Sequence, residues 1–171
     1  TWIPSQHLSG ACRALSAKIT GLPIIRGEDI DNTRCALIVG RNAQIADPVE
    51  GAKLKAAKKR GARMIVIDPK RTTAAELADI WMSPRVGTDA AVALAMMHVL
   101  ISEDLYDRQF VDERCQGFEA LAERAAQFPP SRAERLTGVP AALIADAARM
   151  YADGPSTFVS GHGIDAASNG V

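Results

Sequence analysis

The fold is decided by two stretches, Ala36-Leu37-Ile38-Val39-Gly40-Arg41-Asn42 and Arg63-Met64-Ile65-Val66-Ile67-Asp68-Pro69-Lys70-Arg71. Each contains a short apolar run, rich in β-branched residues, that ends abruptly in polar, Gly or Pro residues. With the Lys- and Ala-rich segment between them, they predict a β-α-β unit. Continuous apolar runs are typical of parallel strands that are buried on both faces. Ligands of open parallel sheets bind beyond the carboxyl ends of the strands, an edge that we call the rim. We therefore expect rim positions at Gly40, Arg41, Asn42, Asp68, Lys70 and Arg71.

Further elements extend this unit. The helix between the two strands covers residues 49–60, and Gly61 ends it after a run of lysines. A short helix follows over 73–78, with Thr72 or Thr73 as its cap, and then a short strand over 80–82. A long apolar helix over 90–101, short helices over 104–137 and a helix over 141–151 precede a fourth strand over 157–160. A short helix over 9–19 precedes the first strand. This order predicts an α/β fold: a Rossmann-like small parallel sheet flanked by helices, with a helical insertion between the third and fourth strands, in one domain over residues 1–171.

Composition narrows the class of protein. Hydrophobic residues make up 47% and charged residues 23% of the 171 residues, which is ordinary for a globular chain and excludes disorder throughout. Lys+Arg and Asp+Glu are balanced at 20 each, so we expect no nucleic-acid partner held by bulk charge. No apolar run is long enough to span a bilayer and no signal-peptide pattern is visible, so we expect no membrane contact and a cytoplasmic location. The widely spaced Cys12, Cys35 and Cys115 have no metal-site spacing, and we expect reduced, mostly buried thiols.

The segment after the first strand suits a phosphate. A loop of small residues lets backbone N–H groups approach a pyrophosphate, and Gly40-Arg41-Asn42 adds a guanidinium and an amide. Because Gly40 is the sole glycine there, the Gly-x-Gly-x-x-Gly fingerprint of ordinary NAD binding is missing. Asp68 lies where a dinucleotide fold places the acid that accepts hydrogen bonds from ribose hydroxyls, although Asp-Pro is also a common structural turn.

Three more groups are candidates, each with an alternative. Lys70 and Arg71 would bind phosphate or form a solvated surface pair. In Gly87-Thr88-Asp89, the acid either caps the following helix or accepts two N–H bonds from a guanine edge. The loop Gly161-His162-Gly163 follows the fourth strand, which places His162 at the rim. His98, inside the apolar helix, reads as a satisfied core residue. No triad, metal cluster or carboxylate pair can be assembled, so these residues alone indicate a nucleotide- or phosphate-binding α/β domain.

An ordered series of motifs resembles one family. It comprises Gly40-Arg41-Asn42, the run from Lys58 to Thr72, Ala78-Asp79-Ile80-Trp81, Gly87-Thr88-Asp89-Ala90-Ala91, Leu136-Thr137-Gly138-Val139-Pro140 and Ser160-Gly161-His162-Gly163-Ile164. The series resembles the molybdopterin oxidoreductases, the group of formate dehydrogenase, nitrate reductase and dimethyl sulfoxide reductase.

The resemblance implies a domain that holds one of two molybdopterin guanine dinucleotides on a molybdenum or tungsten atom. It implies that Gly40 and Asn42 lie by the pyrophosphate. Asp68 would meet the guanosine ribose, with Lys70 and Arg71 nearby. The nucleoside end would meet Gly87 and Asp89, and the pterin would lie near Gly161, His162 and Gly163.

Departures from the family pattern are equally informative. Family enzymes are several times longer and have an iron–sulfur segment, so this chain resembles a fragment whose partners are the remaining domains and electron-transfer subunits, with the iron–sulfur cluster outside it. The family's metal ligand would fall near Gln6-His7, where there is no thiol, and Ser5 or Cys12 would need a gap; no metal ligand is assigned. Two alternatives remain: a cofactor-less structural domain, as in respiratory complex I, and an unrelated module such as the central domain of thiamine-diphosphate enzymes.

Overall fold

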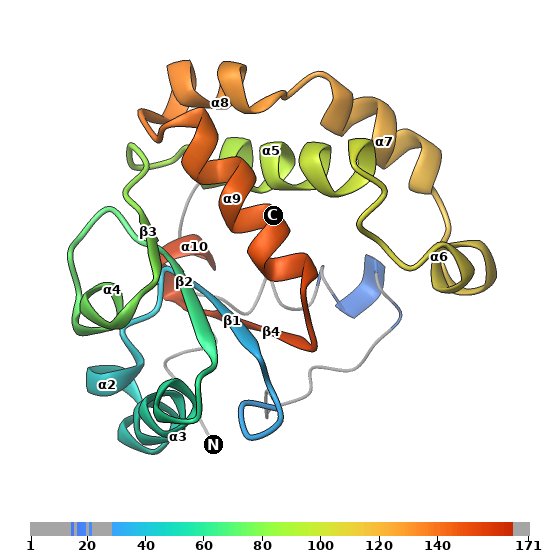
Figure 1. Cartoon of the computed structure of the whole chain (residues 1–171). Coiled ribbons are helices and arrows are strands. Elements are labelled where there is room, and N and C mark those ends of the chain that lie inside the picture. The colour runs from blue at the N-terminus through green and yellow to red at the C-terminus, as the bar shows by residue number, and fades with distance from the viewer. Residues whose placement is uncertain (1–14, 16, 20, 22–28, 166–171) are drawn as a thin grey trace.

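A four-stranded parallel sheet organises the chain (Figure 1). The computed structural model describes residues 15, 17–19, 21 and 29–165. The strands are β1 (Cys35–Val39), β2 (Arg63–Ile67), β3 (Ile80–Met82) and β4 (Ser156–Ser160), in the order β3-β2-β1-β4. In the register, Leu37 pairs with Ile65 of β2 and with Phe158 of β4. The predicted α/β fold is confirmed, with the helical insertion between β3 and β4.

Three helices cover one face of the sheet: α2 (Ala43–Ala46), α3 (Pro48–Lys59) and α4 (Thr73–Leu77). Local signals set their limits. Asp47 caps α3 by accepting hydrogen bonds from the N–H groups of Val49 and Glu50, and a proline occupies the first helical position. Thr72, one of the two predicted caps, accepts a 3.3 Å bond from Ala75 N at the start of α4. The β-α-β crossover therefore follows the sequence prediction closely.

The insertion covers the other face. It consists of α5 (Asp89–Ser102), α6 (Arg108–Arg114), α7 (Phe118–Ala126), α8 (Pro130–Thr137) and α9 (Ala141–Ala152). In Figure 1, α9 crosses the sheet, and α5 lies beside it with α7 and α8 further out. The α5 helix buries Val92, Met96 and Val99, whereas Met97 is exposed. The burial expected from its apolar sequence is thus confined to part of its surface.

The two faces of the sheet bury separate cores, and the residues of β1 alternate between them. Leu37 and Val39 face the core shared with α5 and α9. Ala36 and Ile38 face the core shared with α3 and α4. Because all five residues of β1 are buried, the strand appears in the sequence as an unbroken apolar run.

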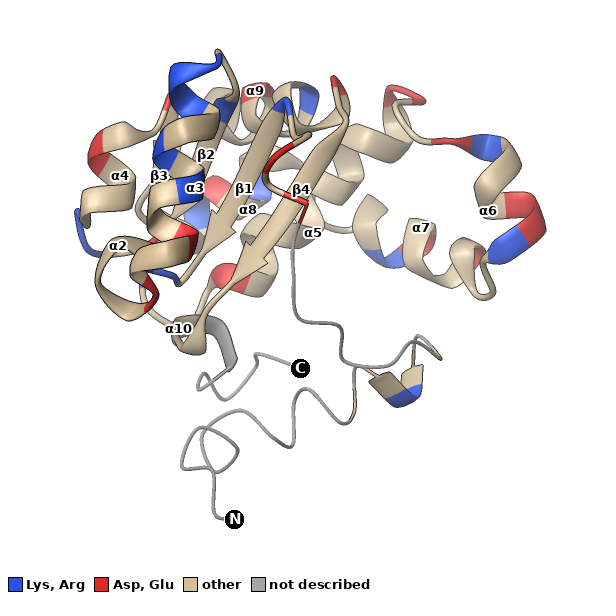
Figure 2. Ribbon diagram, turned by 90° about the horizontal axis from the view of Figure 1, so that it is seen from below, with Lys and Arg blue, Asp and Glu red and all other residues tan. Residues whose placement is uncertain are grey.

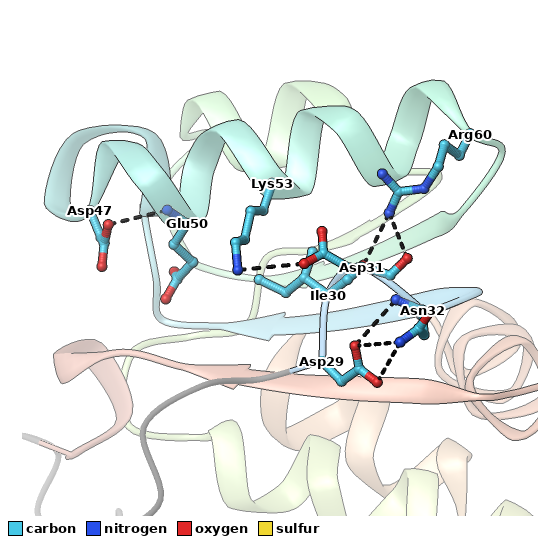
Figure 3. A network of polar contacts seen from close by, with 8 residues as sticks. All are labelled: Asp29, Ile30, Asp31, Asn32, Asp47, Glu50, Lys53 and Arg60. Carbon is cyan, nitrogen blue, oxygen red and sulfur yellow. Dashed lines mark hydrogen bonds and ion pairs between the residues drawn. The ribbon is translucent and has the colours of Figure 1, made fainter.

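The turn that leads into β1 is fastened to α3 (Figure 3). Lys53 pairs with Asp31 at 3.5 Å, and the Arg60 guanidinium donates to the carbonyl oxygens of Ile30 and Asp31. The Asn32 amide donates to Asp29, which closes the turn. These contacts fix where β1 enters the sheet.

Some expectations need correction or lie outside the described residues. Residues 161–163 are not wholly a loop, because one helical turn, α10 (His162–Asp165), starts directly after Gly161. Cys35 is buried but Cys115 is exposed, so the expectation of buried thiols is wrong for Cys115. The helix expected over 9–19 and Cys12 fall largely or wholly outside the described residues. Within the described part of the chain, no helix has the length and apolar character needed to cross a bilayer.

Candidate functional site at the carboxyl edge of the sheet

At the rim, the backbone segments that follow three of the strands lie next to one another and are joined to the neighbouring strands by hydrogen bonds. Gly40 N donates to Ile67 O at 2.9 Å, and Asp68 N donates to Met82 O at 3.1 Å. Gly161 N donates to Val39 O at 3.0 Å. The hydrogen-bond ladder therefore continues one residue past the strands and sets Gly40, Asp68 and Gly161 side by side. Figure 2 shows α2 and α10 beside this edge.

Two glycines let the ends of β1 and β4 approach closely. Gly40 has φ +57°, a left-handed conformation that costs a side chain about 1–2 kcal/mol. A Cβ on Gly161 would lie 2.2 Å from Gly40 O and 2.8 Å from the Arg41 Cα. Gly163 N donates to Gly40 O at 3.3 Å. The surface here is consequently bare backbone, as close contact with a phosphate requires.

The Arg41 guanidinium is turned toward α3. Its Nε and Nη2 donate to the two carboxylate oxygens of Glu50 at 2.9 and 3.1 Å, and the side chains are only 19% and 12% exposed. This bidentate ion pair fastens the loop after β1 to the first turn of α3. Its charge is thereby balanced within the chain.

Buried amide atoms without hydrogen bonds lie in the same segment. Asn42 occupies the cap position of α2, yet its side chain makes no capping bond, and its buried Oδ1 has no hydrogen-bond partner in the part of the chain that the structure describes. The Oε1 and Nε2 atoms of Gln44 are buried and likewise have no partner among the described residues. Each such atom costs about 1–3 kcal/mol, so their presence beside the rim is a sign of function. Sequence reasoning missed Gln44 because only burial distinguishes it from a surface glutamine.

Asp68 forms the predicted structural turn and leaves one carboxylate oxygen without a hydrogen bond from the described residues. One carboxylate oxygen accepts a 2.8 Å bond from Lys70 N, which is the structural turn. The other carboxylate oxygen accepts no hydrogen bond from the described part of the chain. Lys70 and Arg71 are exposed next to it, and the Arg71 guanidinium lies over the Trp81 ring at 5.8 Å from the centroid. An acceptor and two cations are thus close together on one loop.

Asp89 does not cap α5, so the capping alternative is wrong. Thr88 occupies the cap position, and its N–H and hydroxyl both donate to Arg85 O, at 3.1 and 2.6 Å. Asp89 is the first helical residue. Burial raises the pKa of its carboxyl above the ordinary value; a hydrogen bond from its own N–H opposes the rise, and the Asp68 carboxylate adds to it. The two acids therefore lie close enough to interact, although they follow different strands.

Of the two described histidines, His162 lies at the rim and His98 lies in the helical insertion. His162 begins α10 at the rim and is partly buried. His98 Nδ1 lies 3.2 Å from Ala125 O inside the insertion, as expected of a satisfied core residue. No cluster of three or more His, Cys, Asp or Glu side chains within residues 29–165 could hold a metal. The positions considered for metal ligation, Ser5, Gln6, His7 and Cys12, lie outside the described residues.

Comparison with known proteins identifies the family. The profile described as molybdopterin oxidoreductase matches residues 7–171. The chain belongs to this family. Acetylene hydratase of Syntrophotalea acetylenica is 46% identical over 122 residues, 71% of this chain and 17% of that enzyme. Formate dehydrogenase H of Escherichia coli is 37% identical over 131 residues, 77% of this chain and 18% of that enzyme.

A solved structure has the same fold. Acetylene hydratase from Pelobacter acetylenicus superposes with a TM-score of 0.87 and 36% identity, covering 96% of this chain and 23% of the hydratase chain. This molybdopterin oxidoreductase chain therefore spans roughly a fifth of its relatives' length. The resemblance to the molybdopterin oxidoreductases seen in the sequence is thereby confirmed.

Proposed function

We propose that this chain is the domain that binds a molybdopterin guanine dinucleotide within a larger molybdenum or tungsten oxidoreductase. The observation that carries the proposal is that Asp68 follows β2 on the rim next to the bare backbone at Gly40, with Asp89 near enough for the two carboxylates to interact electrostatically. Carboxylates at the nucleoside end and a backbone surface without side chains at the phosphate end are the two halves of a dinucleotide site.

The acids divide the ligand between them. A guanine edge presents two adjacent N–H donors, which a carboxylate accepts together, whereas adenine presents no such pair. Asp89 suits this edge, and the unoccupied oxygen of Asp68 suits the ribose hydroxyls. Because two carboxylates repel phosphate, the phosphates would lie toward Gly40, Asn42, Lys70 and Arg71.

The residues present fit the cofactor. Gly161 and Gly163 let the backbone at Gly40 pack directly against the start of α10, which keeps this part of the rim free of side chains, and His162 extends it toward the proposed pterin side. The buried Asn42 Oδ1 offers an acceptor that no residue within the described ranges satisfies. The metal and pterin would supply the electron-transfer chemistry when bound, and this chain would bind and orient them.

The parent enzyme's reaction has two candidates. A formate dehydrogenase-like activity is supported by the match to formate dehydrogenase H. For that activity we propose the remaining domains and electron-transfer subunits as partners, and the cytoplasm as the location. A hydration of the acetylene hydratase kind is supported by the 46% identity to that enzyme. A cofactor-less structural domain is disfavoured, because such a domain would have no need for Asn42, Asp68 and Asp89 together. Assaying the full-length parent for formate oxidation with a dye acceptor, and for acetylene consumption without one, separates the two activities.

The binding proposal is tested by calorimetric titration of the chain with GDP and with ADP. We expect saturable binding that prefers GDP, and the Asp89→Asn variant should lose that preference, because an amide can accept only one of the two N–H bonds. Glu119→Gln, which removes an exposed first-turn acid of α7 away from the rim, is the matched control and should bind as wild type does. Equal binding of GDP and ADP by the wild-type chain would refute the proposal.

A further inference from the structure

The rim loop from Asp68 to Arg71 is held by β3, the edge strand beside it. Asp68 N donates to Met82 O, and the Trp81 indole Nε1 donates to Asp68 O at 2.9 Å. Ser83 Oγ donates to Pro69 O at 3.0 Å. Both backbone polar groups of Asp68 are thus tied to β3.

Trp81 occupies a particular place in this strand. Its neighbours Ile80 and Met82 point into the core shared with α5 and α9, whereas Trp81 packs against the opposite core. From there its ring also lies beneath the Arg71 guanidinium. A single side chain therefore contacts both the proposed ribose acceptor and the proposed phosphate cation.

We propose that Trp81 is a positioning residue that sets the selectivity of the site for a ribonucleoside diphosphate. The indole N–H fixes Asp68 for the ribose hydroxyls, and the indole face holds Arg71 toward the phosphates. This inference rests on the proposed function.

The indole N–H acts on the orientation of the Asp68 carboxylate. With its N–H, its carbonyl and one carboxylate oxygen all engaged, Asp68 has little freedom to turn. The remaining oxygen is presented in one orientation, so the hydrogen bond to a hydroxyl forms without a further loss of side-chain entropy. Loss of the indole N–H frees the Asp68 carbonyl and loosens that orientation.

The indole ring acts on the Arg71 guanidinium. An exposed arginine is flexible, and the flat face of an indole attracts and orders a guanidinium. The ring therefore keeps a cation beside Asp68 rather than free in solvent. Because the N–H and the ring act on different parts of the ligand, substitutions can separate their effects.

The Trp81→Phe variant keeps an aromatic ring and removes the N–H. Its binding of GDP is compared with that of 2′,3′-dideoxy-GDP, which lacks both ribose hydroxyls. We expect the wild-type chain to prefer GDP by about tenfold or more, since 1.4 kcal/mol corresponds to tenfold. In Trp81→Phe this preference should fall below about threefold, with the affinity for the dideoxy nucleotide unchanged. Thermal unfolding verifies that the variant is folded.

A second variant tests the proposed role of Arg71, and it does so even if Trp81→Phe does not fold. Arg71→Gln, on an exposed side chain, should lower the affinity for both nucleotides equally and keep the ribose preference. In Trp81→Leu, where the aromatic face is also gone, the affinity for the dideoxy nucleotide should fall as it does in Arg71→Gln.

The outcomes separate the two proposals. If the wild-type chain shows no preference for GDP over ADP, the proposed function fails. If it prefers GDP over ADP, three results would each overturn the role of Trp81: no ribose preference in the wild type, an unchanged ribose preference in Trp81→Phe, or an equal loss of both nucleotides in that variant.

Discussion

Adding one methyl group at Gly161 should open the rim. A Cβ there would lie 2.2 Å from Gly40 O, 2.8 Å from the Arg41 Cα and 2.9 Å from the Arg41 Cβ. Two of these neighbours are backbone atoms, so no side-chain rotation relieves the contact. The ends of β1 and β4 must therefore separate by about 1 Å to restore ordinary contact distances. That movement strains the bonds from Gly161 N to Val39 O and from Gly163 N to Gly40 O.

We expect Gly161→Ala to lower the free energy of unfolding by about 1–3 kcal/mol, the usual cost of overpacking. For a chain of this size, each kcal/mol lowers the melting temperature by about 2–4 °C. Circular dichroism during urea and thermal denaturation measures the change. Ser160→Ala, one residue earlier in β4, removes an atom rather than adding one and should unfold close to wild type. A Gly161→Ala variant as stable as Ser160→Ala would show that the two strand ends are not in contact as described.

Further predictions concern charge, buried amides and thiols. Because the folded-state pKa of Asp89 is raised, its contribution to stability decreases as pH rises through that pKa. The affinity for GDP should instead decrease as pH is lowered through the same pKa. Asp89→Asn should remove both dependences, which denaturation and GDP titration across acidic pH measure. Gln44→Met should raise the free energy of unfolding of the ligand-free chain by about 1–3 kcal/mol, because it removes a buried amide without a partner among the described residues. The control Gln109→Met, at an exposed glutamine, should change that free energy little. A destabilised Gln44→Met would mean that the amide is satisfied. Burial raises the pKa of the Cys35 thiol to about 11, so iodoacetamide at mildly alkaline pH should label exposed Cys115 far faster, and equal labelling by peptide mass spectrometry would contradict the burial.

Much of the fold was predictable because its signals are local. The apolar runs of β1 and β2, the cap at Thr72 and the stop at Gly61 each act within a few residues of their position. One departure arose where distant packing decides the outcome, because the turn of α10 forms where Gly163 bonds back to Gly40. The other is local, because Thr88 takes the cap of α5 through a turn that closes on Arg85, three residues earlier.

The candidate site divides in the same way. Its positions at Gly40, Asp68 and Gly161 follow from the ends of the strands, which the sequence marks clearly. The use of each side chain does not follow from its type. The pairing of Arg41 with Glu50 and the burial of Gln44 depend on how α2 and α3 pack, and no local pattern announces either.

The sequence by itself determined the order of elements, the parallel sheet, the location of the rim and the family, because hydrophobic period, capping and motif spacing are properties of the chain alone. The tertiary structure decided which groups meet: Gly161 with Gly40, and Trp81 with both Asp68 and Arg71. It also brought Asp68 and Asp89 within range of electrostatic interaction. The physical reason is that these contacts join different crossovers of the sheet. Their geometry is fixed by strand order and register, which bring together residues with no neighbouring position in the sequence.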